Sequence, residues 1–151
     1  MVSAFESEAP PIVKNANFKS AKDGDWNDPN TWDPIGVPAS GDPVQILGNA
    51  SGGPHTILVK GDQTCGNLTI DAGGRLELDT TAPGSSLTLD DGAVLDNDSE
   101  IRYVGDNTAN ATLSSAGTAV YSPTASAILD WNNLSKCQYG NFIHLYQTFL
   151  V

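Results

Sequence analysis

Two stretches of the chain share one pattern that decides the fold: LTIDAGGRLEL at residues 68–78 and LTLDDGAVLDN at residues 87–97. When their first leucines are aligned, leucine or isoleucine recurs at alternate positions and glycine recurs at the corner. A weaker third copy, ATLSSAGTAVY, follows at residues 111–121. Each copy predicts a strand, a glycine-containing corner, a second strand and a longer return. The copies begin 19 and then 24 residues apart, which is the spacing of a solenoid repeat.

This repeat predicts stacked units. One unit cannot bury its own leucines, whereas units stacked ~4.8 Å apart bury them in a continuous column. The positions expected to lie one above the other are Leu68 with Leu87, Ile70 with Leu89, and Leu76 with Leu95. The predicted fold is therefore all-β, a short right-handed β-solenoid or β-helix-like stack. A meandering β-sandwich is the alternative, although it gives no reason for Thr, Asp and Gly to recur in register.

A short solenoid exposes unpaired strand edges at both ends and needs caps. The turn-rich segment GDWNDPNTWDPIGVPASGDPVQIL, at residues 24–47, contains Trp26, Trp32 and Pro38. We expect these residues to close the amino-terminal end of the column, because each indole can bury ~150–250 Å². The alternative is that the tryptophans form an exposed platform on which sugar rings stack.

The remaining segments are expected to contact other chains. Residues 1–20 predict an extended arm, residues 21–125 the capped β-helix-like domain, and residues 126–151 an apolar cap or interface segment. A solvated terminus would not hold so many apolar side chains together. The expected interface residues are Phe5, Ile12 and Val13 in the arm and Phe142, Ile143, Leu145, Tyr146, Phe149 and Leu150 in the tail. A homo-oligomer follows from this, with a trimer favoured.

Charge and hydropathy exclude several classes of function. The formal net charge is -11, with only 7 Lys and Arg residues, so nucleic-acid binding and attraction to an anionic membrane are disfavoured. No run approaches the ~18 apolar residues of a membrane-spanning helix. The start, MVSAFESEAPPIVKNANF, lacks the pattern of a secretory signal peptide. The protein is thus expected to act where it is made, unless a signal was removed.

Candidate chemical groups are expected to have structural roles. Acids crowd the repeat region, but no calcium-loop motif is present, so we expect corner and surface acids, with adventitious calcium as the alternative. Asp90 and Asp91 are the acids to test if the chain were a glycoside-active enzyme. His55 is expected in a turn before a strand and His144 in the apolar tail, without a catalytic motif around them. No catalytic, cofactor-binding or metal-binding residue is predicted.

Cysteine and asparagine are the two further residue types that could undergo covalent modification. Cys65 and Cys137 lie far apart, and we expect buried or half-buried thiols, with a single disulfide as the alternative. Asparagine followed two residues later by Ser or Thr marks glycan acceptors in secreted proteins, but the same string arises where an Asn corner precedes a strand. These positions are Asn49, Asn67, Asn97, Asn110 and Asn133.

The segment from Gly24 to Leu47, followed by HTILV, NLTIDAGGRLEL and LTL, resembles a module of β-helix proteins. That module, which has a G-x-W-x-D-P-x-T-W signature before its rungs, is common in bacterial cell-surface and phage fibre or decoration proteins, and is distantly similar to G8-type domains. The resemblance covers roughly residues 22–100 and implies architecture more than activity. This chain has GGPHTILVKGD where the module usually has a GHTVTVD hairpin, so no role carries over to His55.

These observations favour a non-enzymatic structural or attachment protein. The expected setting is a virion surface, as a phage capsid decoration, head fibre or tail fibre. The alternative is a bacterial extracellular adhesin or filament subunit at the cell surface, with a glycan as a further partner. A third reading is a fragment of a polysaccharide-degrading β-helix enzyme.

Overall fold

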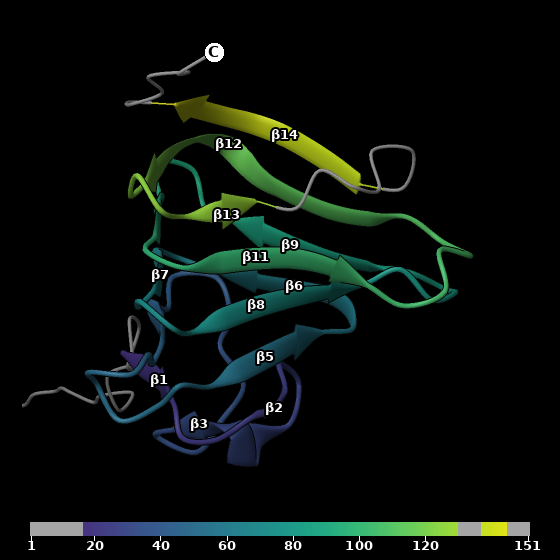
Figure 1. Ribbon diagram of the computed structural model, residues 1–151. Coiled ribbons are helices and arrows are strands. Elements are labelled where there is room, and N and C mark those ends of the chain that lie inside the picture. Colours follow the sequence, from purple (N-terminus) through teal and green to yellow (C-terminus); the bar gives the residue numbers. More distant parts are fainter. Residues whose placement is uncertain (1–16, 130–136, 145–151) are drawn as a thin grey trace, which may run out of the picture.

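A computed structural model describes residues 17–129 and 137–144 of the chain, and these residues form a stack of strands (Figure 1). The larger sheet contains β1 (Phe18–Ser20), β3 (Trp32–Asp33), β4 (Val44–Ile46), β6 (Gly61–Cys65), β7 (Leu68–Ile70), β9 (Ser85–Leu89), β10 (Val94–Asn97), β12 (Ala111–Pro123) and β14 (Cys137–His144). The smaller sheet contains β2 (Gly24–Asp25), β5 (Thr56–Val59), β8 (Arg75–Asp79), β11 (Glu100–Val104) and β13 (Ile128–Leu129). A short 3-10 turn, η1 (Pro29–Thr31), lies before β3.

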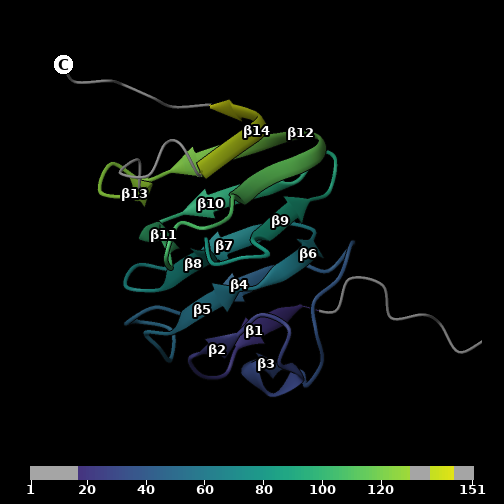
Figure 2. The same ribbon diagram turned by 90° about the vertical axis from the view of Figure 1, so that its right-hand side faces the viewer.

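The chain winds around three faces in turn, and successive coils pair in parallel. Face 1 consists of β1, β4, β7, β10 and the carboxyl-terminal half of β12. Face 2 consists of β2, β5, β8, β11 and β13. Face 3 consists of β6, β9 and the amino-terminal half of β12. Because β12 runs through the corner from face 3 to face 1, these two faces join into one sheet; Figures 1 and 2 show the stack from two sides.

The predicted fold class, an all-β solenoid, is confirmed, but the predicted stacking of the repeat is wrong. Leu68 pairs with Leu95 in the next coil, not with Leu87. Leu87 lies on face 3, between Gln63 and Leu113. The physical reason is that a coil has three strands, whereas each copy of the repeat has two. The copy at 68–78 therefore covers faces 1 and 2, and the copy at 87–97 covers faces 3 and 1.

The third copy is also displaced from its predicted register. Leu87 pairs with Leu113, whereas the sequence alignment matched Leu113 with Leu89. This shift of two residues keeps every inward side chain inward, because side chains alternate across a strand. Hydrophobic alternation therefore predicted which residues are buried while leaving their exact partners undetermined.

The core is a set of aliphatic columns that run along the stack. The inward side chains of face 1 are Val44, Leu68, Leu95 and Tyr121 in one column and Ile46 and Ile70 in the next. Those of face 2 are Ile57, Leu76 and Ile101, beside Val59, Leu78 and Tyr103. Those of face 3 are Leu87 and Leu113, beside Cys65 and Leu89. All of them are buried, so the interior is a packed core.

A buried amide side chain interrupts one of the columns of face 1. Asn97 follows Ile46 and Ile70 on face 1 and is 0% exposed. Its Oδ1 accepts the backbone N–H of Ser99 at 3.0 Å, and its Nδ2 donates to the Tyr121 hydroxyl at 3.1 Å and to the Ile128 carbonyl at 3.3 Å. A buried amide is tolerated when it is hydrogen-bonded in this way.

The amino-terminal end of the column is closed by aromatic rings. Trp26 and Trp32 are 0% and 1% exposed, and their ring centroids lie 5.1 Å apart in an edge-on arrangement. Phe18 packs against Trp32 with centroids 6.5 Å apart, and the Trp32 Nε1 donates to the Trp26 carbonyl oxygen at 2.8 Å. Pro38 is buried as well. The predicted tryptophan cap is therefore present, and a sugar-stacking platform of these tryptophans is ruled out by their burial.

Corners between strands depend on glycine at two positions of the repeat. Gly73 has φ 96° between β7 and β8, and Gly92 has φ 80° between β9 and β10. Residues with a Cβ rarely adopt this left-handed region. These are the glycines that the repeat alignment matched, so their recurrence reflects a shared corner conformation.

Candidate functional site

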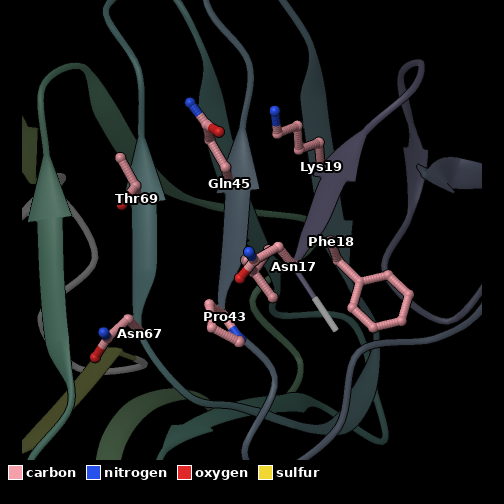
Figure 3. Close-up of a pocket in the computed structure, with 8 residues that line it drawn as sticks. Asn17, Phe18, Lys19, Pro43, Gln45, Asn67 and Thr69 are labelled. Carbon is pink, nitrogen blue, oxygen red and sulfur yellow. The ribbon is translucent and has the colours of Figure 1, made fainter. Parts of the chain in front are cut away.

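A polar pocket of about 350 Å³ lies on the outer surface of face 1, near the capped end. It crosses the starts of β1, β4 and β7, whose side chains alternate between the core and the outside. The lining residues are Asn17, Phe18, Lys19, Pro43, Val44, Gln45, Asn67 and Thr69. Because Phe18 and Val44 point into the core, the outer surface of the pocket is formed by the other six (Figure 3).

Two rows of outward side chains border this pocket. Lys19 pairs with Gln45 and Gln45 with Thr69 in the parallel register, so these three side chains stand side by side in Figure 3. Asn17, Pro43 and Asn67 precede the same three strands and form the second row. Rows two residues apart on parallel strands are separated by ~6.6 Å, which leaves a groove that crosses the strands along the stack. We call this feature the face 1 groove.

The two rows of outward side chains continue beyond the pocket onto β10 and β12. Asp96 pairs with Thr69 and with Ser122, so it extends the row that begins at Lys19. Val94, 37% exposed, extends the other row, and its backbone N–H donates to the Asn67 Oδ1 at 2.9 Å. The two rows therefore span several coils, which suits an extended ligand.

Charge changes sign along the groove. Lys19 is exposed at the capped end, whereas Asp96 lies on β10. Burial raises the pKa of the Asp96 carboxyl, and the nearby Asp98 and Asp71 carboxylates raise this pKa further. The groove thus has a cationic end and an acidic end.

Two amide side chains in the groove are held in defined orientations. The Gln45 Nε2 donates to Asp71 Oδ2 at 2.8 Å, which leaves the Gln45 Oε1 as an acceptor. The bond from the Val94 N–H to Asn67 Oδ1 leaves the Asn67 Nδ2 as a donor. Fixed amides can recognise hydroxyl and carboxylate groups with little loss of side-chain entropy. The arrangement suits noncovalent binding of a polar ligand.

The acids singled out for a glycoside-active enzyme are engaged elsewhere. Asp90 accepts hydrogen bonds at 2.6 Å from the Ser40 hydroxyl and from the Gly41 backbone N–H. Asp91 accepts the Thr118 backbone N–H at 2.8 Å. Both carboxylates thus fix loops at the corners of the stack, which is the structural role expected for acids in the repeat.

His55 lies directly before β5, as expected, and also has a structural partner. Its Nδ1 and the Ser20 hydroxyl are hydrogen-bonded to each other at 2.8 Å. The same hydroxyl oxygen accepts the Leu47 backbone N–H at 2.9 Å, and Ser20 is 1% exposed. The pair therefore ties β1 to the loop between β4 and β5, and the buried hydroxyl is inaccessible to a substrate.

The other candidate residues fall into three groups. Cys65 is a buried free thiol, and burial raises its thiol pKa strongly. Asn49, Asn67 and Asn110 are exposed, whereas Asn97 is buried and hydrogen-bonded, so Asn97 is not a glycan acceptor in the folded protein. Asn133 lies outside the described residues, as do the side chains of Cys137 and His144.

The expected interface residues fall mainly outside the described part of the chain. Phe5, Ile12, Val13, Leu145, Tyr146, Phe149 and Leu150 lie outside it, and Phe142 and Ile143 are described only through the backbone of β14. Of the arm expected at residues 1–20, Phe18–Ser20 belong to β1 of the stack, and residues 1–16 lie outside the described residues. Similarly, Ile128 and Leu129 of the expected tail belong to β13 on face 2.

Sequence reasoning did not identify the groove residues. The signal was present, since FKS, VQI and LTI each place one polar residue between two inward side chains. Only the correct three-strand register brings Lys19, Gln45 and Thr69 side by side. Within residues 17–129 and 137–144, no group of three or more His, Cys, Asp or Glu side chains is placed to hold a metal ion. The described residues contain no helix long and apolar enough to cross a membrane.

Comparison with known proteins gave no match: no family model fits the chain, and no curated protein or solved structure is similar to it.

Proposed function

We propose that the chain is a non-enzymatic structural or attachment protein of a virion surface, such as a phage capsid decoration, head fibre or tail fibre. The observation that supports it is the difference between the two ends of the stack. The amino-terminal end is sealed by Trp26 and Trp32. At the other end β13 is the last strand of face 2 in the described part of the chain, and its Ile128 is 50% exposed (Figure 1).

An open strand edge with an exposed aliphatic side chain favours contact with another protein. We place the contact at the carboxyl-terminal end, with the apolar residues of 145–151 as part of it. The assembly is a homo-oligomer, with a trimer favoured, and its function is to present a stiff acidic surface. A stiff unit of this kind is supported by the packed inward columns and by the ion pairs on the outside of face 2, such as Arg75 with Glu100 at 2.5 Å.

Co-sedimentation with particles tests this role. Particles from the source culture are banded on a density gradient, and the chain is quantified in each fraction by mass spectrometry. A fixed copy number per particle that survives high salt supports the proposal. A chain found only in the cell-surface or free fractions refutes it and favours the second candidate. Light scattering of the purified full chain measures the oligomeric state, and a monomer at all concentrations argues against self-assembly.

The second candidate is a glycan-binding adhesin or filament subunit of a bacterial surface. The polar groove on face 1 favours it, because side chains with free hydrogen-bonding groups border it. Titration of the purified chain with oligosaccharides separates the two candidates, since a purely structural unit gives no saturable binding.

A further inference from the structure

Lys19 is unusual among the cations of this acidic protein. Among residues 17–129, each of the other Lys and Arg side chains lies within 4.0 Å of a carboxylate: Lys22, Lys60, Arg75 and Arg102. Lys19 has no such partner in that part of the chain, although the net charge of the whole sequence is -11. Asp33 is the register partner of Lys19 on β3, but the two do not form an ion pair within 4.0 Å. The Lys19 ammonium is therefore a cation available to a ligand, and it stands at one end of the face 1 groove.

The rest of the groove supplies neutral hydrogen-bonding groups. Gln45 presents an acceptor and Asn67 presents a donor, because their other amide atoms are already bonded to Asp71 and Val94. The Thr69 hydroxyl stands next to Gln45 in the same row. Mixed donors and acceptors of this kind match the hydroxyl groups of a sugar, and the apolar surfaces of Pro43 and Val94 match its C–H faces.

Spacing favours an extended saccharide. Successive groups in the row lie on neighbouring strands, ~4.8 Å apart. A pyranose linked through C1 and C4 advances its chain by roughly one strand spacing per ring, so consecutive rings meet consecutive strands. The change of charge along the groove then determines which sugar lies at which end. Lys19 attracts a sugar that carries a carboxylate, whereas Asp96 repels one and accepts a neutral sugar.

We propose that the face 1 groove binds an oligosaccharide with a uronate at the Lys19 end and neutral sugar rings toward Asp96. The Lys19 ammonium pairs with the uronate carboxylate, while Gln45 and Asn67 bond the hydroxyls of the neighbouring ring. Asp96 accepts hydrogen bonds from hydroxyls of a neutral ring. A polyuronate of four or more rings, or a polyphosphate of similar length, is rejected because the anion three strand spacings beyond Lys19 meets Asp96 on β10. This inference rests on the glycan-binding candidate of the proposed function and names its site and ligand class.

Calorimetric titration of the full chain tests this at low salt with three probes: glucuronosyl-β-1,4-glucose, cellobiose and tetragalacturonate, whose four rings span the strands from Lys19 to Asp96. The mixed disaccharide should bind, and Lys19→Met should weaken it about tenfold, to the level of cellobiose, through loss of a charge-assisted hydrogen bond. Lys22→Met is the matched control, since Lys22 is exposed at the same end of the stack and pairs with Asp28. It should leave the affinity unchanged. Raising the salt concentration should weaken the mixed disaccharide more than cellobiose.

Three results would overturn the inference. If the parent protein and Lys19→Met bind the mixed disaccharide with equal affinity, Lys19 does not bind the uronate, although the protein could still bind glycans. Tighter binding of tetragalacturonate than of the mixed disaccharide contradicts the repulsion expected at Asp96. No saturable binding of any probe removes the groove as a saccharide site, whereas the virion role is tested separately by co-sedimentation. Asp96→Asn checks the reasoning in the opposite direction, because removing this carboxylate should raise the affinity for tetragalacturonate.

Discussion

The hydrogen bond inside the tryptophan cap makes two similar substitutions unequal. Trp32 and Trp26 are both almost fully buried, and replacing either with phenylalanine removes a similar volume. The Trp32 Nε1 donates to the Trp26 carbonyl oxygen at 2.8 Å, whereas the Trp26 Nε1 is buried with no hydrogen-bond partner in the described structure. Trp32→Phe therefore strands a buried acceptor, while Trp26→Phe removes a buried donor that was already unpaired.

The expected difference in unfolding free energy follows from this asymmetry. A buried polar group left without its partner costs about 1–3 kcal/mol, so Trp32→Phe should be more destabilising than Trp26→Phe by about that amount. With a slope near ~2 kcal/mol/M in urea, the unfolding midpoint should differ by about 0.5–1.5 M between the two variants. Far-UV circular dichroism is the appropriate probe, because both substitutions change the tryptophan fluorescence itself.

Ile35→Ala is the control for general effects on the cap loop. Ile35 is 77% exposed, so this substitution should change the free energy of unfolding by less than about 0.5 kcal/mol. If Trp26→Phe proves as destabilising as Trp32→Phe, the hydrogen bond does not stabilise the cap as argued. If Ile35→Ala is as costly as either, the loop packs differently from the structure described above.

Three further predictions concern the core, the acidic end of the groove and the thiol. Leu76→Ala should lower the free energy of unfolding by about 2–5 kcal/mol in urea titrations, whereas the outward Leu58→Ala should have a much smaller effect. Burial and Asp98 raise the pKa of Asp96, so Asp96→Asn should stabilise the fold above that raised pKa. The gain should disappear as the pH falls below the ordinary carboxyl value of 3.8, and a gain that persists there would contradict the assignment. Cys65 should resist alkylation in the native state and react in urea, measured by peptide mass mapping, because burial raises its thiol pKa and blocks access.

Alternation along the sequence was sufficient to predict which residues are buried. Burial of Leu68, Ile70 and Leu76 is predicted because they alternate with polar residues, and each is 0% exposed. The tryptophans were assigned to a cap because large apolar rings in a turn-rich segment need a surface to cover. These features depend on local pattern and on the free energy of apolar burial, which act over a few residues.

The partner strand of each segment could not be predicted in the same way. Parallel strands in a coil are joined by corners of different length, so the period along the chain varies from coil to coil. Leu76 lies 19 residues after Ile57, its partner in the previous coil, and 25 before Ile101, its partner in the next. A repeat of strand, corner and strand matches any two neighbouring faces, and the alignment chose the wrong pair. Because the face 1 groove exists only in the correct register, its residues could not be identified either.

Asn97 shows how such a register can be enforced once the coils form. A slip of two residues keeps the aliphatic side chains inside, so hydrophobic burial alone discriminates weakly against it. The Asn97 Nδ2, however, donates to Tyr121 and Ile128 on other strands, and a slip of β10 relative to them would leave this buried N–H group without these acceptors. A slipped alignment of β10 on β12 would therefore cost about 1–3 kcal/mol, because the buried amide would be left unsatisfied. The alignment of β10 on β12 also determines which outward side chains stand next to each other on face 1. Asn97, which is buried and takes no part in binding, therefore helps to set the geometry of the face 1 groove.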